Sequence, residues 1–211
     1  MIENISQEKL NSNWERFKYL LLNTQREGVD ELIDYLENKT DFKTAPASTK
    51  YHGAFQGGLC AHSLSVYDTL VRLVDNVLPQ DISINSESLI ITALLHDISK
   101  VNTYETTYFN KKVYSSTGSK FDENGKFDWV SEKGYKMRED RFVFVNHEST
   151  SEFIARQFIN LSIKESTAIM THHNGLCYDS IPTDAVAKVY GENNLAVLLH
   201  IADLMAAYMI C

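Results

Sequence analysis

The chain has 211 residues and a formal net charge of −8, from 20 basic and 28 acidic side chains. This length suits one domain, and a hydrophobic fraction of 44% is enough to form a core, which argues against wholesale disorder. Because phosphate affinity comes from Lys and Arg, the acidic balance argues against tight binding of duplex nucleic acid. Three cysteines without a CxxC pair argue against a disulfide framework and a thiolate zinc site.

Neither end of the chain has the pattern of a membrane segment. The N-terminus, MIENISQEKL, lacks the apolar core of a signal peptide. The longest apolar stretch, residues 195–211, is interrupted by His200 and Asp203, and a carboxylate in the middle of a membrane span is costly. We therefore expect a cytoplasmic protein that does not bind a membrane.

Apolar residues recur at helical spacing along most of the chain. The spacing predicts helices over 8–22, 29–38, 59–77, 86–99, 148–160, about 163–172, and from about 193 to the end. Ser162-x-x-Glu165 resembles a capping box that opens the sixth of these helices. In residues 102–146, turn-forming Asn and Gly alternate instead with the β-rich runs 104–109, 126–130 and 141–145. Since Asn124-Gly125 is typical of a hairpin turn, we expect a mainly α fold with a small β-hairpin insertion.

The insertion also differs in charge and in aromatic content. It carries eight basic and seven acidic side chains, a net of +1, whereas the rest of the chain carries −9. A weakly basic flap would suit an anionic ligand, although a solvated hairpin of mixed charge explains the same excess. The aromatic side chains could stack on bases or pack on a strand face. They are Tyr104, Tyr108, Phe109, Tyr114, Trp129 and Tyr135.

Four histidines and two aspartates lie on or beside helices that we expect to be buried. They are His62, His96, Asp97, His147, His172 and Asp203. Adjacent helix positions point about 100° apart, so His96 and Asp97 reach one site only near a helix end or around a bound cation. Neutral imidazole and carboxylate are natural ligands for manganese, iron and zinc, so the set predicts a site for a transition metal.

Asp203 strengthens this prediction because it lies in LAVLLHIADLMAAYMI, a helix that is apolar on nearly every face. An ionised carboxylate buried there without a partner would cost several kcal/mol. It needs a cation or a dense set of hydrogen bonds. His200, one turn earlier, is an alternative structural partner.

Three motifs, HSL at 62–64, LLHDISK at 94–100 and HIADLMAAY at 200–208, resemble the HD-domain metal-dependent phosphohydrolase superfamily. The segment 51–68, YHGAFQGGLCAHSLSVYD, is similar to bacterial and phage HD proteins related to the HD domain of 3′–5′ exoribonucleases. The resemblance implies an HD-domain helical bundle over residues 51–211, with residues 1–50 as a helical extension packed on it. The chain departs from the exoribonuclease relatives because no OB-type domain precedes the HD segment, which weakens an RNA-processing assignment.

The resemblance also implies roles for individual residues. It places His62, His96, Asp97 and Asp203 around one metal, with His147 and His172 completing a second metal position that Asp97 bridges. We prefer His172 to His173 because of its place in AIMTHHNG, and His173 then faces substrate or caps the helix. Asp97 and Lys100 are the candidate catalytic residues, and the candidate substrate contacts are Lys100, His52, His173 and Lys50.

The implied activity is hydrolysis of a nucleotide or another phosphoester by a metal-bridged hydroxide. The cofactor would be one or two divalent transition metals, with manganese, iron or zinc preferred and magnesium and nickel as further candidates. The partner would be a small phosphorylated substrate such as a nucleotide, and an oligomer is compatible with the apolar C-terminal helix. Three alternatives stay open: an HD-fold di-iron oxygenase, a non-catalytic nucleotide-binding module, and a purely structural helical protein.

Overall fold

Helices make up most of the computed structural model, which describes residues 5–79, 81–142, 144–173 and 183–210. The helices are α1 (Gln7–Asn23), α2 (Val29–Asn38), α3 (Gly58–Val77), α4 (Ser86–Leu95), α5 (His147–Arg156), α6 (Ile163–Thr171), α7 (Thr183–Glu192) and α8 (Asn194–Met205). A 3-10 turn over Ile98–Lys100 follows α4, and a π-type turn over Ala206–Ile210 follows α8. The prediction of a mainly α fold is confirmed.

The helices pack around two clusters of buried apolar side chains. Helix α3 lies at the centre, in contact with α1, α4 and α8. Trp14 and Phe17 of α1 join Phe42 in the larger cluster, where the rings of Phe17 and Phe42 have centroids 4.6 Å apart. The N-terminal helices therefore share a core with α3 and α4, while a domain boundary at residue 50 stays a prediction.

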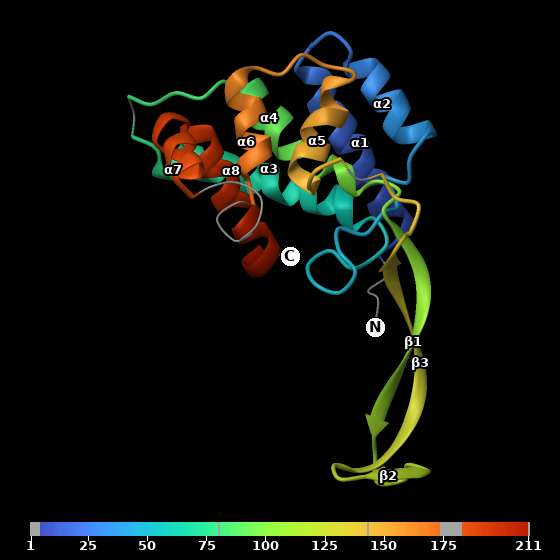
Figure 1. The fold of residues 1–211 in the computed structure, drawn as a ribbon. Helices are drawn as coiled ribbons and strands as arrows, with labels where there is room; N and C mark the ends of the chain where they lie inside the picture. The colour runs from blue at the N-terminus through green and yellow to red at the C-terminus, as the bar shows by residue number, and fades with distance from the viewer. Residues whose placement is uncertain (1–4, 80, 143, 174–182, 211) are drawn as a thin grey trace.

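A long antiparallel hairpin extends away from the helical body (Figure 1). Strand β1 (Tyr104–Tyr114) pairs with β3 (Gly125–Met137), and the short β2 (Lys120–Asp122) pairs with the start of β3. The expected turn at Asn124-Gly125 is present, with Gly125 at a φ of 116°, but it joins β2 to β3. The two long strands are instead joined through residues 115–124.

The structure corrects four details of the predicted elements, and the first is that the helix predicted over 148–160 ends at Arg156. The described residues of the run 141–145 do not form a strand. The last backbone hydrogen bond at the base of the hairpin, from the Arg138 amide to the Thr103 carbonyl, comes before this run begins. The helix predicted over 86–99 ends at Leu95, and Asp97 has a φ of −112° outside the helical region. Helix α7 was missed because its apolar stripe is short and ends at Gly191.

Two further findings concern cysteines and membranes. Cys60 is free and buried, whereas Cys177 and Cys211 lie outside the described residues. No single helix in the described ranges is both long enough and apolar enough to cross a membrane. Residues 184–192 and 194–210, bent by 108° from one another, meet the length and composition test only as a pair.

The capping box at the start of α6 is confirmed, and its glutamate also ties three segments together. Glu165 accepts hydrogen bonds from the Ser162 amide and the Ser88 hydroxyl, at 2.8 and 2.7 Å. The Arg26 guanidinium, from the loop between α1 and α2, binds both carboxylate oxygens at 2.8 and 2.5 Å. Burial alone would raise the pKa of Glu165, but these donors lower it to about 2.

We expect Glu165→Gln to lower the free energy of unfolding by about 2–3 kcal/mol at pH 7, because it removes a buried charge with four donors. Because the pKa of Glu165 is lower in the folded chain, its contribution is complete above the ordinary value of 4.5. The contribution disappears as the pH falls from about 4.5 to about 2. Urea unfolding of wild type and variant across this range measures the loss.

The control is Asp68→Asn, at an exposed pair with Arg16, which should change the free energy of unfolding little. Equal stability of Glu165→Gln and wild type at pH 7 would contradict this account.

Candidate metal centre

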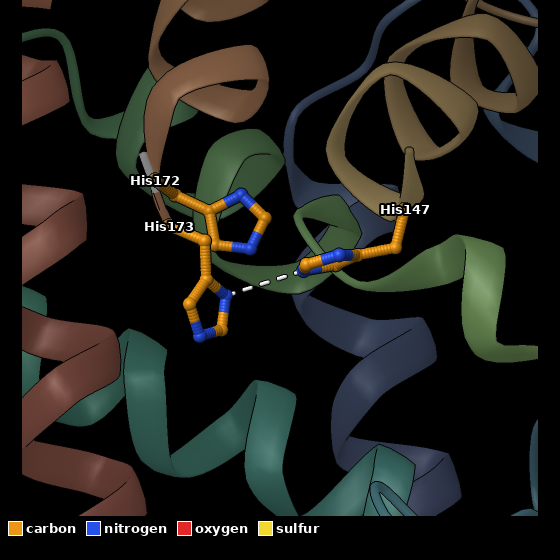
Figure 2. Close-up of side chains that lie close together, drawn as sticks. All are labelled: His147, His172 and His173. Atoms are coloured by element: carbon orange, nitrogen blue, oxygen red, sulfur yellow. Dashed lines mark hydrogen bonds between the residues drawn. The ribbon is translucent and has the colours of Figure 1, made fainter. Parts of the chain in front are cut away.

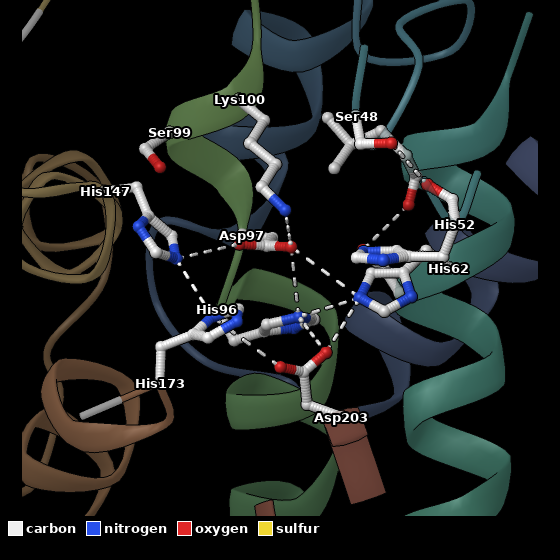
Figure 3. A network of polar contacts seen from close by, with 12 residues as sticks. Ser48, His52, His62, His96, Asp97, Ser99, Lys100, His147, His173 and Asp203 are labelled. Carbon is white, nitrogen blue, oxygen red and sulfur yellow. Dashed lines mark hydrogen bonds and ion pairs between the residues drawn. The ribbon is translucent and has the colours of Figure 1, made fainter. Parts of the chain in front are cut away.

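The residues that the sequence singled out come from five separate elements of the helical body. His62 lies on α3, His96 and Asp97 follow α4, His147 begins α5, His172 ends α6, and Asp203 lies on α8. Figure 3 shows the labelled side chains of the centre pointing toward one another between these helices. The early end of α4 matters here, because the turn after Leu95 lets the adjacent His96 and Asp97 face the same space.

The first group of ligand atoms is formed by His62, His96 and Asp203, all of them buried. The Nε2 atoms of the two histidines are 3.3 Å apart. The Asp203 Oδ1 atom lies 2.9 Å from His62 Nε2 and 3.6 Å from His96 Nε2. Ligand atoms about 2.1 Å from a shared ion lie about 3.0–3.4 Å apart, so this triangle is close to the size that a metal requires.

A second group is formed by His147, His172 and His173, which Figure 2 shows converging from α5 and the end of α6. The Nε2 atom of His147 lies 3.2 Å from Nδ1 of His173. His172 Nε2 and His147 Nε2 lie 3.7 and 3.8 Å from Oδ1 of Asp97. The structure therefore brings both His172 and His173 to this group, where the sequence interpretation preferred His172.

Asp97 stands between the two groups and turns one oxygen toward each. Its Oδ2 atom lies 3.6 Å from His62 Nε2 and 3.4 Å from His96 Nε2. Its Oδ1 atom faces His147 and His172, is buried, and accepts no hydrogen bond from the described residues. His172 Nε2 is likewise buried without a hydrogen-bond partner among them. Because unpartnered buried polar atoms are costly, these two atoms fit a cation placed between them.

The histidine rings are also oriented for coordination. Nδ1 of His96 donates to the Ala93 carbonyl at 2.8 Å, and Nδ1 of His172 donates to the Ile169 carbonyl at 2.7 Å. These bonds place the proton on Nδ1 of each neutral ring and leave the Nε2 lone pair facing the centre. Outer partners of this kind fix the tautomer of metal-binding histidines.

The buried carboxylates of the centre need a positive charge close to them. Burial alone would raise the pKa values of Asp97 and Asp203, but neighbouring groups hold both well below their usual range. The main such neighbours are Lys100 beside Asp97 and His62 beside Asp203. Burial alone would lower the pKa of His96, but the two carboxylates raise it to about 10. The two buried carboxylates have one lysine beside them, so one negative charge is left to be neutralised. It is neutralised by a proton on His96 or by a metal cation that takes the place of that proton.

Two members of the second group, His147 and His173, are neutral at neutral pH. Burial lowers the pKa of His147 to about 3 and the pKa of His173 to about 4. Neutral imidazoles are the form that coordinates a metal. The donor set of nitrogen and carboxylate oxygen suits manganese, iron or zinc better than magnesium, which prefers oxygen alone.

The remaining predicted residues lie at different distances from the centre. Lys100 is largely buried, and its Nζ donates to Asp97 Oδ2 at 2.6 Å, so it is not a solvated side chain of the surface. The ring of His52 contacts the ring of His62, with centroids 4.7 Å apart and a tilt of 40°, and its buried Nε2 has no hydrogen-bond partner among the described residues. Lys50 is exposed and lines a hollow beside the hairpin. His200 binds the His172 carbonyl, while His62 and His96 are the partners of Asp203.

Sequence reasoning missed Glu148, the residue after His147. Its side chain is buried, and Oε2 lies 3.1 Å from Nδ1 of His147. A carboxylate in this position can hold the ring so that Nε2 faces a metal. The available signal was a glutamate in the first turn of a helix, and the interpretation as an ordinary helix-start charge is more common.

We expect Glu148→Gln to weaken the second metal position about 10- to 100-fold while leaving the first unchanged, because it removes the charge behind His147. Calorimetric titration of Mn²⁺ into chelator-treated protein measures both positions. Glu152→Gln, on the same helix but paired with Arg156, is the matched control and should bind Mn²⁺ as wild type does. Identical titrations of Glu148→Gln and wild type would show that Glu148 does not support the metal.

The comparison with protein families gives one result that covers most of the chain. The model of the HD domain matches residues 59–208, a range that contains all the residues of both ligand groups. No curated protein and no solved structure matches the chain significantly. HD domains bind divalent metals, and most are metal-dependent phosphohydrolases. The extent of the match shows that this chain belongs to the HD domain family.

Proposed function

We propose that the chain is a phosphohydrolase that uses one or two divalent transition metals to cleave a nucleotide or another phosphoester. The observation that carries the proposal is the position of Asp97, whose two oxygens face two groups of buried ligand atoms. His62, His96 and Asp203 would hold one metal, and His147, His172 and His173 the other. When bound, such a metal makes hydroxide available from water near neutral pH and offsets charge on phosphoryl oxygens.

The role of Lys100 follows from its burial and its charge. The Nζ atom is held 2.6 Å from Oδ2 of Asp97, the oxygen that faces His62 and His96. Burial by itself would lower the pKa of Lys100, but Asp97 raises it, so the ammonium stays charged. Once a metal neutralises Asp97, this ammonium is free to donate to a phosphoryl oxygen as a point charge.

Space for a substrate adjoins the centre. A hollow of about 230 Å³ is lined by Lys100, His147, Tyr104 and Arg141, among other residues. Two cationic side chains therefore border the space next to the candidate ligands, which suits an anionic substrate. His52 and His173 are further candidate contacts, because both rings adjoin the ligand groups.

The proposal is tested by loading chelator-treated protein with Mn²⁺ and measuring phosphate release or diester cleavage across a panel of nucleotides and a chromogenic phosphodiester. We expect turnover of at least one substrate under argon, and loss of turnover when chelator is added again. Binding of nucleotides without turnover would instead support a non-catalytic module. Turnover that requires O₂, with an O₂-sensitive absorption spectrum of iron-loaded protein, would instead support the di-iron oxygenase.

A further inference from the structure

The two faces of the hairpin differ in chemistry. Side chains alternate between the faces of a strand, and directly paired residues share a face. The register Tyr104↔Met137 to Tyr114↔Phe127 places the even-numbered residues of β1 with the odd-numbered residues 127–137 of β3. We call this set the aromatic face. It has six aromatic side chains and two lysines, and none of its residues in 104–114 and 127–137 is acidic.

The opposite face of the same strands is neutralised by its own ion pairs. Lys136 lies 2.9 Å from Glu105, and Lys111 lies 3.3 Å from Glu132. On the aromatic face, Lys112 lies 2.6 Å from Asp122 of β2, whereas Lys133 has no acidic partner within 4 Å among the described residues. Within 104–114 and 127–137, the lysine without such a partner is therefore on the aromatic face.

Three of the six aromatic side chains of this face are exposed, whereas Phe127 is buried and packs against two of them, Tyr114 and Trp129. Tyr108, Tyr114 and Trp129 are 69%, 45% and 48% exposed. Figure 1 shows the hairpin projecting from the helical body, with the described helices gathered at its base. Near the tip, Lys112 lies over the rings of Phe127 and Trp129, at 4.5 and 5.6 Å from their centroids. The rings of this face thus form a row that is open to solvent at Tyr108, Tyr114 and Trp129, with the exposed Lys133 in it.

This row begins at the candidate metal centre. Tyr104 and Met137, the first pair of the aromatic face, line the hollow of about 230 Å³ together with Lys100 and His147. An 11-residue strand spans about 35 Å, several times the length of a mononucleotide. A ligand that used the whole face would therefore be a polymer with one end at the metal centre.

We propose that the aromatic face of the hairpin binds single-stranded nucleic acid and guides it toward the metal centre. Exposed rings offer stacking platforms for bases, and stacking tolerates any sequence. Few lysines are needed for such binding, which is compatible with the net charge of −8. A duplex hides its bases and depends on many phosphate contacts, so it is not the ligand. The inference rests on the function proposed above, because it names the substrate class of that site.

The test measures the fluorescence anisotropy of two labelled single-stranded oligonucleotides of about twelve nucleotides, one made of thymidine and one made of uridine. Chelator is present to prevent cleavage. We expect both oligonucleotides to bind more tightly than a duplex of equal length. Trp129→Ala and Lys133→Glu should each weaken binding, Trp129→Ala roughly tenfold. Val130→Ala and Lys136→Glu make matching changes at neighbouring positions on the opposite face and should change affinity less than about twofold.

The inference is overturned if the single strands do not bind, or if the variants of both faces lose affinity equally. It is also overturned if the hairpin instead joins two copies of the chain. Sedimentation would then show a dimer that the Trp129→Ala substitution dissociates and that added oligonucleotide does not dissociate. Circular dichroism confirms that each variant is folded, which is expected because all four side chains are exposed.

Hydrolysis of a small phosphodiester by Mn²⁺-loaded protein separates this inference from the proposed function. Lys133→Glu and Trp129→Ala should cleave the small diester at the wild-type rate, since neither side chain lines the centre. Diester cleavage without oligonucleotide binding would overturn the hairpin inference alone. Oligonucleotide binding without cleavage of any substrate would overturn the proposed function and leave the binding face supported.

Discussion

Asp97→Asn is expected to lower kcat/KM by about a thousandfold or more and to lower the metal content of the purified protein. The two oxygens of the carboxylate face the two ligand groups, so the amide weakens both positions at once. Asparagine has nearly the same volume, and its amide oxygen can accept the hydrogen bond that Lys100 donates at this position. We therefore expect the variant to stay folded. Elemental analysis, a hydrolysis assay and circular dichroism measure the three outcomes on one preparation.

The control for Asp97→Asn is Asp75→Asn, an exposed aspartate on α3, the helix that carries His62. It should match the wild type in metal content and in turnover. The account fails if Asp97→Asn retains normal metal content and normal kcat/KM, because the central carboxylate would then be a structural residue.

Lys100→Met is expected to lower kcat/KM by about a hundredfold while the metal content stays normal. Methionine keeps much of the aliphatic volume and removes the ammonium that lies 2.6 Å from Asp97. In the metal-loaded protein the cation compensates for the lost charge beside Asp97, so binding of metal should not weaken. The two readouts therefore separate Lys100 from the ligands, since variants of the ligands lose metal as well as activity.

Lys100→Arg tests the same role with the charge retained and should recover part of the activity of Lys100→Met. A fall in metal content of Lys100→Met that matches its fall in activity would show that Lys100 supports the metal centre. Full activity of Lys100→Met would show that the lysine acts only as the counter-ion of Asp97.

The helical part of the fold was predictable because its apolar stripes are long. The prediction over 29–38 matches α2, the one over 8–22 is one residue shorter than α1 at each end, and the one over 59–77 begins one residue after α3. The end of α4 was not predictable in this way. Leu94, Leu95 and Ile98 are all buried, so the apolar pattern continues through the turn. The break is set by the positions of His96 and Asp97, and helical periodicity carries no signal for it.

The hairpin shows a second limit of sequence patterns. The run 141–145 has strand-like composition, but a strand also requires a partner at the correct distance, and β1 pairs only with β3 there. Composition gave the aromatic residues of the insertion but not their grouping. That grouping depends on the register, which is fixed by the long connection through β2 and not by the Asn124-Gly125 turn alone.

The candidate ligands were predictable as a set, while their arrangement was not. The order of His62, His96-Asp97 and Asp203 along the sequence predicts a metal centre. The structure brings these residues together from three elements. The choice between His172 and His173 could not be made, because adjacent residues beyond a helix end can both reach one place. Glu148 was missed because its role depends on burial and on the position of the neighbouring ring.

The most direct test of the metal centre is elemental analysis of wild-type protein purified without chelator, combined with Mn²⁺ titration of the same protein after chelation. The account predicts bound transition metal in the purified protein and about two Mn²⁺ positions per chain in the titration. Protein that purifies without metal and does not bind Mn²⁺ at micromolar concentration would contradict it.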